Sequence, residues 1–348
     1  MKKWLYLVIA SVCVLGFVVI GCAKPAEKIR YKMGTTSSRS SLYVSATTFA
    51  KIVNKYVPEV EVSVVETGAT HDNLVKTRAG MLDFGWCTSY DGSCMAYSGT
   101  MREEYKKAGP YKELRTGPGY VASATYYVIV DEGPYKKIKK LEDLEGVKFS
   151  AGIKGSATEF AAHLILDALG ITPKWTPGSY GDMIAAAKDL ELAGVVKWTA
   201  HIQLDSSLLD LQSRRKVKIL SFTEDQLKTA LKTVPGMVSF RVPAGAITAL
   251  PEHPAITTYG MVVGPNLTTK MPQDIVYKMT KALCEHWDEF IAAYKSSKPW
   301  KPIEDELKYW SEIAEITTVP PFHAGMVQYF EEQGYKVPAK LIPPEYKK

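Results

Sequence analysis

A repeating order of strand, polar turn and helix constrains the fold of this chain more than any other feature. Residues 29–33 are expected to form a strand, and a Ser- and Thr-rich turn at 34–41 leads into a helix with one apolar face. Two more strands are predicted at 60–65 and 82–87, with a helix at 70–79 between them. β-branched strands in this order predict a parallel sheet covered by helices.

The alternation restarts in the second half of the chain. It follows an irregular stretch at 88–120 and a strongly β-prone run at 121–130. The second set is expected to comprise strands at 147–151, 194–198 and 217–222, helices at 157–169 and 180–190, another helix between 198 and 217, and a helix after Thr223. A further strand at 256–263, a long helix at 272–294 and one helix beyond residue 320 are expected to follow. Two α/β sets, each with its own strands, turns and helices, predict two lobes.

The first 22 residues have the pattern of a bacterial lipoprotein signal. A short basic start, an apolar run at 4–20 and Gly21 lead to Cys22. We expect cleavage before Cys22, lipid on its sulfur, a polar tether at 23–28 and a membrane-anchored protein in the periplasm or at the cell surface. The alternative is a signal-anchor helix, although the run is short for a membrane span.

Composition narrows the partners and the chemistry. The chain has 43 Lys and Arg against 37 Asp and Glu, a mild excess that weakly favours anionic solutes. Basic residues form no stripe interleaved with aromatics, so nucleic acid is not an expected partner. No His or Cys pair has metal-ligand spacing, so we expect neither metal nor cofactor. Cys87 and Cys94 allow a bridge in an exported protein, and buried free thiols are the alternative.

Four polar turns lie where predicted strands end and helices begin. In open parallel sheets, ligands bind outside the carboxyl ends of the strands, where helix N-termini point inward. The candidate ligand contacts in these turns are Thr36, Ser37 and Arg39 in the first, Thr67 and Ala69 in the second, Trp86 and Ser89 in the third, and Gly155, Ser156, Ala157 and Thr158 in the fourth.

Several of these residues suit an anion. Arg39 is able to hold a carboxylate through two parallel hydrogen bonds, and a plain surface arginine is the alternative. Ser156 and Glu159 have capping-box spacing, and the free amides at the start of that helix favour a negative group. Trp86 and Trp198 would line an apolar part of the site, with core packing as the alternative for Trp86.

Motifs of an enzyme are not evident. There is no GxSxG elbow, no kinase set and no paired nucleophile and base, so we expect a binding protein without catalytic residues.

Several segments, in one order, match a known family. They are residues 31–35, 64–69 with Asn73, 83–85 with Ser89, 141–147 followed by 152–158, and 320–325 with Tyr329 and Gly334. Together they resemble the TAXI-type solute receptors of tripartite ATP-independent periplasmic (TRAP) transporters. The resemblance also places Tyr43 and Asn73 in the ligand site. His71 stands where a small apolar residue is usual, so the ligand need not be the glutamate-like acid that the family is known for.

The resemblance implies an α/β, two-lobed periplasmic-binding-protein-like fold of type II, with mixed sheets flanked by helices and a hinge between the lobes. We expect lobe I to comprise 29–130 and 243–348, and lobe II to comprise 131–242, with crossings near Val130 and Val242.

The expected function is that of an extracytoplasmic receptor. It would close its lobes on a small organic anion, a carboxylate or an amino-acid-like solute, and deliver it to a TRAP-type permease. The alternative is a periplasmic sensory module of the same fold that serves a signalling partner. An exported enzyme is a third reading, which the missing nucleophile and base disfavour.

Overall fold

The computed structural model describes residues 27–119, 121–199, 201–295 and 300–347. Cys22 and most of the expected signal and tether lie outside the described residues. Within the described residues, no helix has the length and apolar character needed to cross a membrane.

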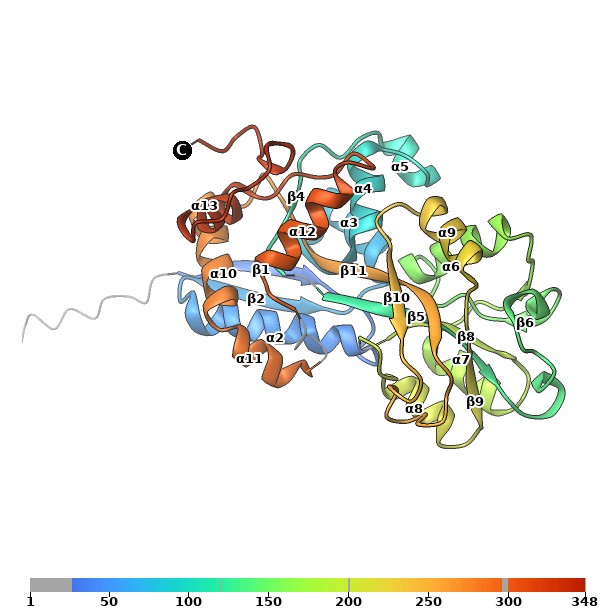
Figure 1. Ribbon diagram of the computed structural model, residues 1–348. Helices are drawn as coiled ribbons and strands as arrows, with labels where there is room; N and C mark the ends of the chain where they lie inside the picture. Colours follow the sequence, from blue (N-terminus) through green and yellow to red (C-terminus); the bar gives the residue numbers. More distant parts are fainter. Residues whose placement is uncertain (1–26, 120, 200, 296–299, 348) are drawn as a thin grey trace, which may run out of the picture.

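Lobe I is built on a mixed sheet with the strand order β2-β1-β3-β11, and β4 also pairs with β11. β1 pairs in parallel with β2 and β3, whereas β11 runs antiparallel to β3 and β4. The strands of this lobe are β1 (Ile29–Gly34), β2 (Val60–Val65), β3 (Phe84–Ser89) and β4 (Leu114–Thr116), together with part of β11 (Ile256–Thr268). Figure 1 shows α2 on one side of this sheet and α3 and α4 on the other.

The helices of lobe I come from both ends of the chain. They are α2 (Ser41–Tyr56), α3 (Thr70–Arg78), α4 (Tyr90–Ser98), α5 (Glu103–Ala108), α10 (Gln273–Glu285), α11 (Trp287–Ala293), α12 (Glu304–Ile313) and α13 (Ala324–Glu332), with the 3-10 turn η4 (Ala339–Leu341). α2 shows why a helix forms here: its buried Ala46, Phe49 and Val53 recur at helical spacing, and Ser40 caps its first turn by accepting from the Leu42 amide.

Lobe II is a second α/β layer structure. Its strands are β6 (Lys148–Phe149), β7 (Lys174–Trp175), β8 (Gly194–Trp198), β9 (Val217–Leu220) and β10 (Val238–Val242). Its helices are α6 (Ala157–Ala168), α7 (Tyr180–Lys188), α8 (Ser206–Gln212) and α9 (Glu224–Thr233), with the 3-10 turns η1 (Gly133–Tyr135) and η2 (Leu141–Leu144). α6 contacts α9, and α7 contacts α8, so two pairs of helices cover the lobe (Figure 1).

Two long antiparallel strands connect the lobes. β5 (Val121–Val130) pairs with β11 through residues 121–124, and then with β8 and β9 of lobe II through residues 125–130. β11 pairs with β10 at its beginning and with β3 and β4 at its end. These observations confirm the predicted fold class: an α/β fold of the periplasmic-binding-protein type, with mixed sheets flanked by helices.

Some elements differ from the sequence-based expectation. The stretch at 88–120, expected to be irregular, contains α4, α5 and β4. The single helix expected at 272–294 is two helices, because the backbone leaves the helical region at His286, with φ −115° and ψ 30°. α12 was not predicted at all. A helical hydrophobic pattern continues across such a break, since both helices bury one face against the same lobe.

Candidate functional site

A small, partly open cavity of about 40 Å³ lies between the lobes, beyond the ends of β1, β3 and β8. Lobe I lines it with Thr36, Ser40, Leu42, Ala69, Thr70, Cys87 and Ser89. Lobe II lines it with Ile153, Ser156, Ala157, Thr158, Tyr180, Lys197 and Trp198, and the connecting strand β11 adds Met261 and Val263.

Helix N-termini meet at this cavity from both lobes. Ser40, Ser89 and Ser156 are the N-caps of α2, α4 and α6, and each side chain accepts one amide of its own helix. Ala69 is the N-cap of α3 and has no side-chain cap bond. Because the first amides of a helix have no intrahelical acceptor, these termini bring free N–H groups and partial positive charge to the cavity.

Two cavity residues have a backbone conformation that side chains rarely adopt. Ala69 has φ 71° and ψ −148°, and Cys87 has φ 55°. Such strain is characteristic of functional sites, where surrounding structure holds it in place. Burial raises the pKa of the Cys87 thiol well above its usual range, so this sulfur is a neutral wall of the cavity and not a nucleophile.

Lys197 brings a charge into the cavity lining. Its side chain is 1% exposed, and its Nζ lies 3.0 Å from Oδ2 of Asp205 and 3.4 Å from the centre of the Tyr180 ring. The other oxygen of Asp205 accepts hydrogen bonds from Ser207 and from the Leu208 amide, which fixes the carboxylate at the start of α8. Burial lowers the pKa of Lys197, and the Asp205 carboxylate opposes that effect.

One wall of the cavity is apolar. It consists of Leu42, Ile153, Met261 and Val263, together with the Trp198 ring. The Trp198 indole donates to the Met261 carbonyl over 3.2 Å, which holds the ring in place. The cavity therefore joins an electropositive side to an apolar side, the arrangement that suits a small amphipathic anion.

The structure brings together half of the residues predicted for the ligand site. Thr36, Ala69, Ser89, Ser156, Ala157, Thr158 and Trp198 line the cavity. That these residues contact a ligand stays a prediction.

The other predicted residues are not among those that line the cavity. The Asn73 amide donates to the carbonyls of Thr35 and Trp86, so it ties the first turn to β3. The Thr67 hydroxyl, with its one proton, lies within hydrogen-bond distance of two acceptors, the Thr35 carbonyl at 2.8 Å and Oδ1 of Asn73 at 2.6 Å. Trp86 is fully buried, donates to Ser45 and packs on Phe49, as in its core-packing alternative.

Gly155 donates its amide to Glu159 over 2.6 Å and has φ +80°. Ser37 and Tyr43 are half-buried on the first turn and α2.

Arg39 lies at the edge of the lobe interface. Together with residues of α7 and α8, it lines a neighbouring hollow of about 360 Å³. Tyr180 lies between this hollow and the central cavity and lines both. The Ser206 hydroxyl of lobe II donates to the Arg39 carbonyl over 3.2 Å. In this structure Arg39 thus contacts the opposite lobe instead of lining the central cavity.

Sequence reasoning missed Lys197, Tyr180 and Thr70. A usable signal existed for Lys197, because it is the one charged residue in the strand Gly194–Trp198, all of which is buried. Tyr180 is the first residue of α7 and Thr70 the first residue of α3. Polar and aromatic residues are common at the start of a helix, so the sequence does not mark these two as residues of a ligand site.

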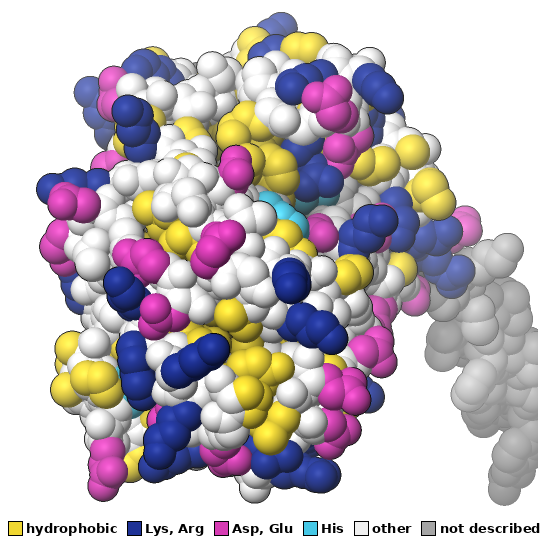
Figure 2. Space-filling model, turned by 90° about the vertical axis from the view of Figure 1, so that its right-hand side faces the viewer, with side chains coloured by type: hydrophobic (Ala, Val, Ile, Leu, Met, Phe, Trp, Pro, Cys, Tyr) yellow, Lys and Arg dark blue, Asp and Glu magenta, His cyan; other side chains and the backbone are white. Residues whose placement is uncertain are grey.

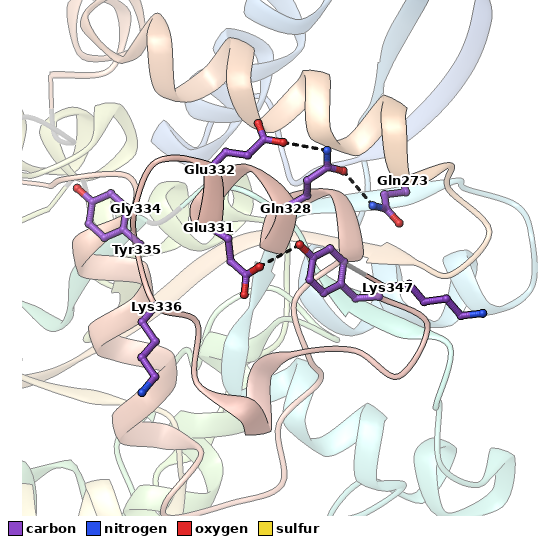
Figure 3. A pocket seen from close by; sticks show the side chains of 9 residues that line it. Gln273, Gln328, Glu331, Glu332, Gly334, Tyr335, Lys336 and Lys347 are labelled. Atoms are coloured by element: carbon purple, nitrogen blue, oxygen red, sulfur yellow. Dashed lines mark hydrogen bonds between the residues drawn. The ribbon is translucent and has the colours of Figure 1, made fainter.

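A larger hollow of about 700 Å³ lies on lobe I beside α10, α13 and the C-terminal segment (Figure 3). Its polar side chains bind one another: Gln273 donates to Gln328, Gln328 donates to Glu332, and Tyr346 donates to Glu331. All of its described lining residues belong to lobe I, and most of their polar groups pair with one another, so we do not take it as the ligand site.

Neither a metal-ligand cluster nor a disulfide is found in the described part of the chain. No group of three or more His, Cys, Asp or Glu there is placed to hold a metal ion. Cys87 and Cys94 are buried free thiols, the second of the two alternatives left open by the sequence. On the lobe II end shown in Figure 2, basic and acidic side chains are interspersed, without a continuous basic surface.

The fold and the cavity define the class of two-lobed α/β proteins with a site between the lobes. The chain belongs to the NMT1-like family, whose model matches residues 33–334.

Solved structures to which this chain is similar include three binding proteins. The alkanesulfonate-binding protein SsuA from Xanthomonas axonopodis pv. citri, bound to MOPS, is 14% identical over 91% of this chain and 97% of its own, with a TM-score of 0.44. The periplasmic aliphatic sulphonate binding protein SsuA from Escherichia coli is 16% identical over 92% and 94%, with a TM-score of 0.43.

The ligand binding component of an ABC-type import system from Staphylococcus aureus, with zinc bound, is 12% identical over 92% and 99%, with a TM-score of 0.45. Because all three scores are below 0.5, what these proteins bind says nothing about the ligand of this chain.

Proposed function

We propose that this protein is an extracytoplasmic receptor that binds a small organic anion between its lobes and passes it to a membrane permease. One observation carries the proposal. The N-termini of α2, α3, α4 and α6, with the Lys197 ammonium, lie around one small cavity that both lobes line. Helix N-termini and a buried cation stabilise a negative group and provide no general base for turnover.

Binding in this arrangement favours closure. Ser156, Ala157 and Thr158 approach the cavity from lobe II, and Thr36, Ala69 and Ser89 approach it from lobe I. A ligand that contacts both sets stabilises the closed form over the open one by the contacts that only the closed form offers.

The hinge is proposed in the connecting strands. Residues 121–124 of β5 pair with residues 260–263 of β11. After this segment β5 pairs with β8 of lobe II, and β11 pairs with β3 of lobe I, so the paired segment lies between the two lobes. We therefore propose the lobe boundaries near these residues; the crossings expected from the sequence, near Val130 and Val242, lie where β5 pairs with β9 and where β10 pairs with β11.

The proposed transport partner and the proposed membrane anchor are inferred from the sequence. The segments that resemble TAXI-type receptors support a TRAP-type permease as the partner, and Cys22 after an apolar run supports a lipid anchor in the periplasm or at the cell surface. A tether of this kind keeps a receptor near its permease and raises its effective concentration there.

Replacing Ala157 by proline tests the anion site. Ala157 is the first residue of α6, where proline fits a helix, and Ser156 before it is extended (φ −80°, ψ 158°), as the residue before a proline must be. Ala157→Pro removes one amide from the cavity. A screen of pyruvate, L-lactate, 2-oxoglutarate and ethanesulfonate by thermal shift, followed by calorimetry, should show affinity for the best ligand reduced about ten- to a hundredfold, the value of a charged hydrogen bond of roughly 1.5–3 kcal/mol.

Glu224→Pro is the matched control. Glu224 is the first residue of α9 in the same lobe, follows an extended residue (Thr223, φ −72°, ψ 165°) and does not line the cavity. The control should bind like the unmodified protein. Equal affinity of Ala157→Pro and Glu224→Pro, or no binding of any anion in the screen, would contradict the proposed function.

A further inference from the structure

The charges around the cavity are unequal in sign. Lys197 is the charged residue of its described lining, and no Asp or Glu is among the lining residues. The carboxylate that pairs with Lys197 is that of Asp205, which is buried. Its Oδ2 lies 3.0 Å from the Lys197 ammonium, and its Oδ1 accepts hydrogen bonds from the Ser207 hydroxyl and the Leu208 amide. Asp205 offsets the Lys197 charge at 3.0 Å, and Asp91 in the first turn of α4 is buried outside the described lining, so the positive character of the cavity comes mainly from the helix N-termini.

This positive character discriminates between kinds of acid. A carboxylate gains charge-assisted hydrogen bonds from amides and from Lys197. The ammonium of an amino acid would be desolvated in a positive field without a carboxylate to pair with it, which is strongly unfavourable. Ser and Thr hydroxyls of the lining are able to bind a neutral hydroxyl or oxo group of the ligand instead.

The size of the cavity adds a second restriction. The cavity volume of about 40 Å³ is the space open to the centres of water molecules, and one water needs about 10–15 Å³ of it, so the cavity holds about three waters. In the liquid, three waters occupy roughly 90 Å³, which is about the volume of a short organic acid. The walls resist expansion, because Trp198 is tied to the Met261 carbonyl and the Tyr180 ring lies against the Lys197 ammonium.

We propose that the ligand is a compact carboxylate without an ammonium group, such as a hydroxy- or oxo-acid of about two to four carbons, and that Lys197 recognises its charge. This inference rests on the proposed function and narrows its ligand class. The carboxylate would lie between the Lys197 ammonium and the first amides of α6, and the short carbon chain would face Leu42, Met261 and Val263.

Lys197 is suited to this role by its surroundings. Its ammonium is held between Asp205 and the Tyr180 ring, and its only described ion pair is with Asp205. Burial lowers its pKa, and an anion in the cavity would act with Asp205 to keep the ammonium protonated.

Matched ligands test the charge restriction. L-lactate and L-alanine differ by a hydroxyl in place of an ammonium. Calorimetry should show L-lactate or pyruvate bound at least tenfold more tightly than L-alanine or L-glutamate. Affinity should then fall at least tenfold from 2-hydroxybutyrate to 2-hydroxyhexanoate, because the longer chain does not fit.

Variants test Lys197 itself. Lys197→Met should weaken L-lactate or pyruvate binding at least tenfold. Because that variant leaves Asp205 buried without its cation, the double variant K197M/D205N provides a neutral pair, and it should melt cooperatively like the unmodified protein yet still lose binding. Lys228→Met is the control, since Lys228 is an exposed lysine of α9 paired with Asp225.

The outcomes separate this inference from the proposed function. Tight binding of L-alanine, L-glutamate or 2-hydroxyhexanoate, or unchanged L-lactate and pyruvate binding by K197M/D205N, would overturn the ligand class while leaving a receptor in place. Failure of every acid to bind would overturn both.

Discussion

Ala69 is the most strained residue of the cavity. Its φ of 71° and ψ of −148° fall in a region that is essentially restricted to glycine. Its amide donates to Thr67, and its carbonyl accepts from the Asn73 amide, so hydrogen bonds on both sides hold it there. The strained backbone starts α3 with its first amides toward the cavity side of lobe I.

Ala69→Gly should therefore stabilise the protein. Glycine adopts this conformation without strain, and relief of about 1–3 kcal/mol outweighs its added unfolded-state entropy of up to about 1 kcal/mol. We expect a gain of about 1 kcal/mol in the free energy of unfolding, measured with urea. The control Ala185→Gly, at an exposed position inside α7, should lose about 0.5–1 kcal/mol. A loss of stability in both variants would show that Ala69 is not strained.

At the scale of helices and strands, a buried carboxyl group on α12 joins that helix to α4 and to the backbone just before β5. Glu306 of α12 is fully buried, and its two oxygens meet the Tyr90 hydroxyl at 2.9 Å and the Gly119 amide at 3.2 Å. The same hydroxyl is 2.7 Å from the Gly119 carbonyl. Tyr90 has one proton, so a protonated Glu306 that donates to Tyr90 allows Tyr90 to donate to Gly119. Burial raises the pKa of Glu306 to about 8, in agreement with this network.

This pKa predicts a loss of stability as pH rises. The folded protein keeps the proton up to about pH 8, whereas the unfolded chain releases it near pH 4.5, the ordinary pKa of a glutamate, so the folded state binds more protons in between. The contribution of Glu306 to the free energy of unfolding should therefore fall by about 1–2 kcal/mol between pH 6.5 and 8. Burial lowers the pKa values of His71 and His323 to about 3 and 4, so these residues take up protons near pH 6.5 only in the unfolded chain and act in the opposite direction; the Glu306 contribution is therefore the difference between the unmodified protein and Glu306→Gln.

Glu306→Gln should remove most of this pH dependence, since an amide keeps the shape without titrating. Glu312→Gln, at an exposed position of the same helix, should keep it. Urea unfolding at the two pH values provides the measurement. Parallel pH dependence in Glu306→Gln and the unmodified protein would rule out Glu306 as its source.

On the scale of the whole molecule, contacts between the lobes flank the cavity. On one side the Ser206 hydroxyl donates to the Arg39 carbonyl. On the other, Phe160 of α6 lies 5.5 Å from the His71 ring and 4.9 Å from the Arg102 guanidinium, both from lobe I. A further contact, the hydrogen bond from the Tyr309 hydroxyl of lobe I to the Gly236 carbonyl of lobe II, is buried.

The sequence predicted the architecture better than the cavity. Periodicity placed the strands at 60–65 and 194–198 where the structure has β2 and β8, since burial on one side of a regular element leaves a repeating pattern. A cavity depends on which side chains face one another across two lobes, and no local pattern records that. Asn73 and Lys197 illustrate the difference: Asn73 ties backbone segments together, whereas Lys197 reaches the cavity from the middle of a buried strand.

Closure of the lobes around a small anion is most directly measured by small-angle X-ray scattering of the purified protein with and without saturating ligand. The account predicts that pyruvate, L-lactate or another short acid lowers the radius of gyration, because the ligand draws both lobes onto the cavity between them. A radius of gyration unchanged by every acid, from acetate to 2-oxoglutarate, would contradict it.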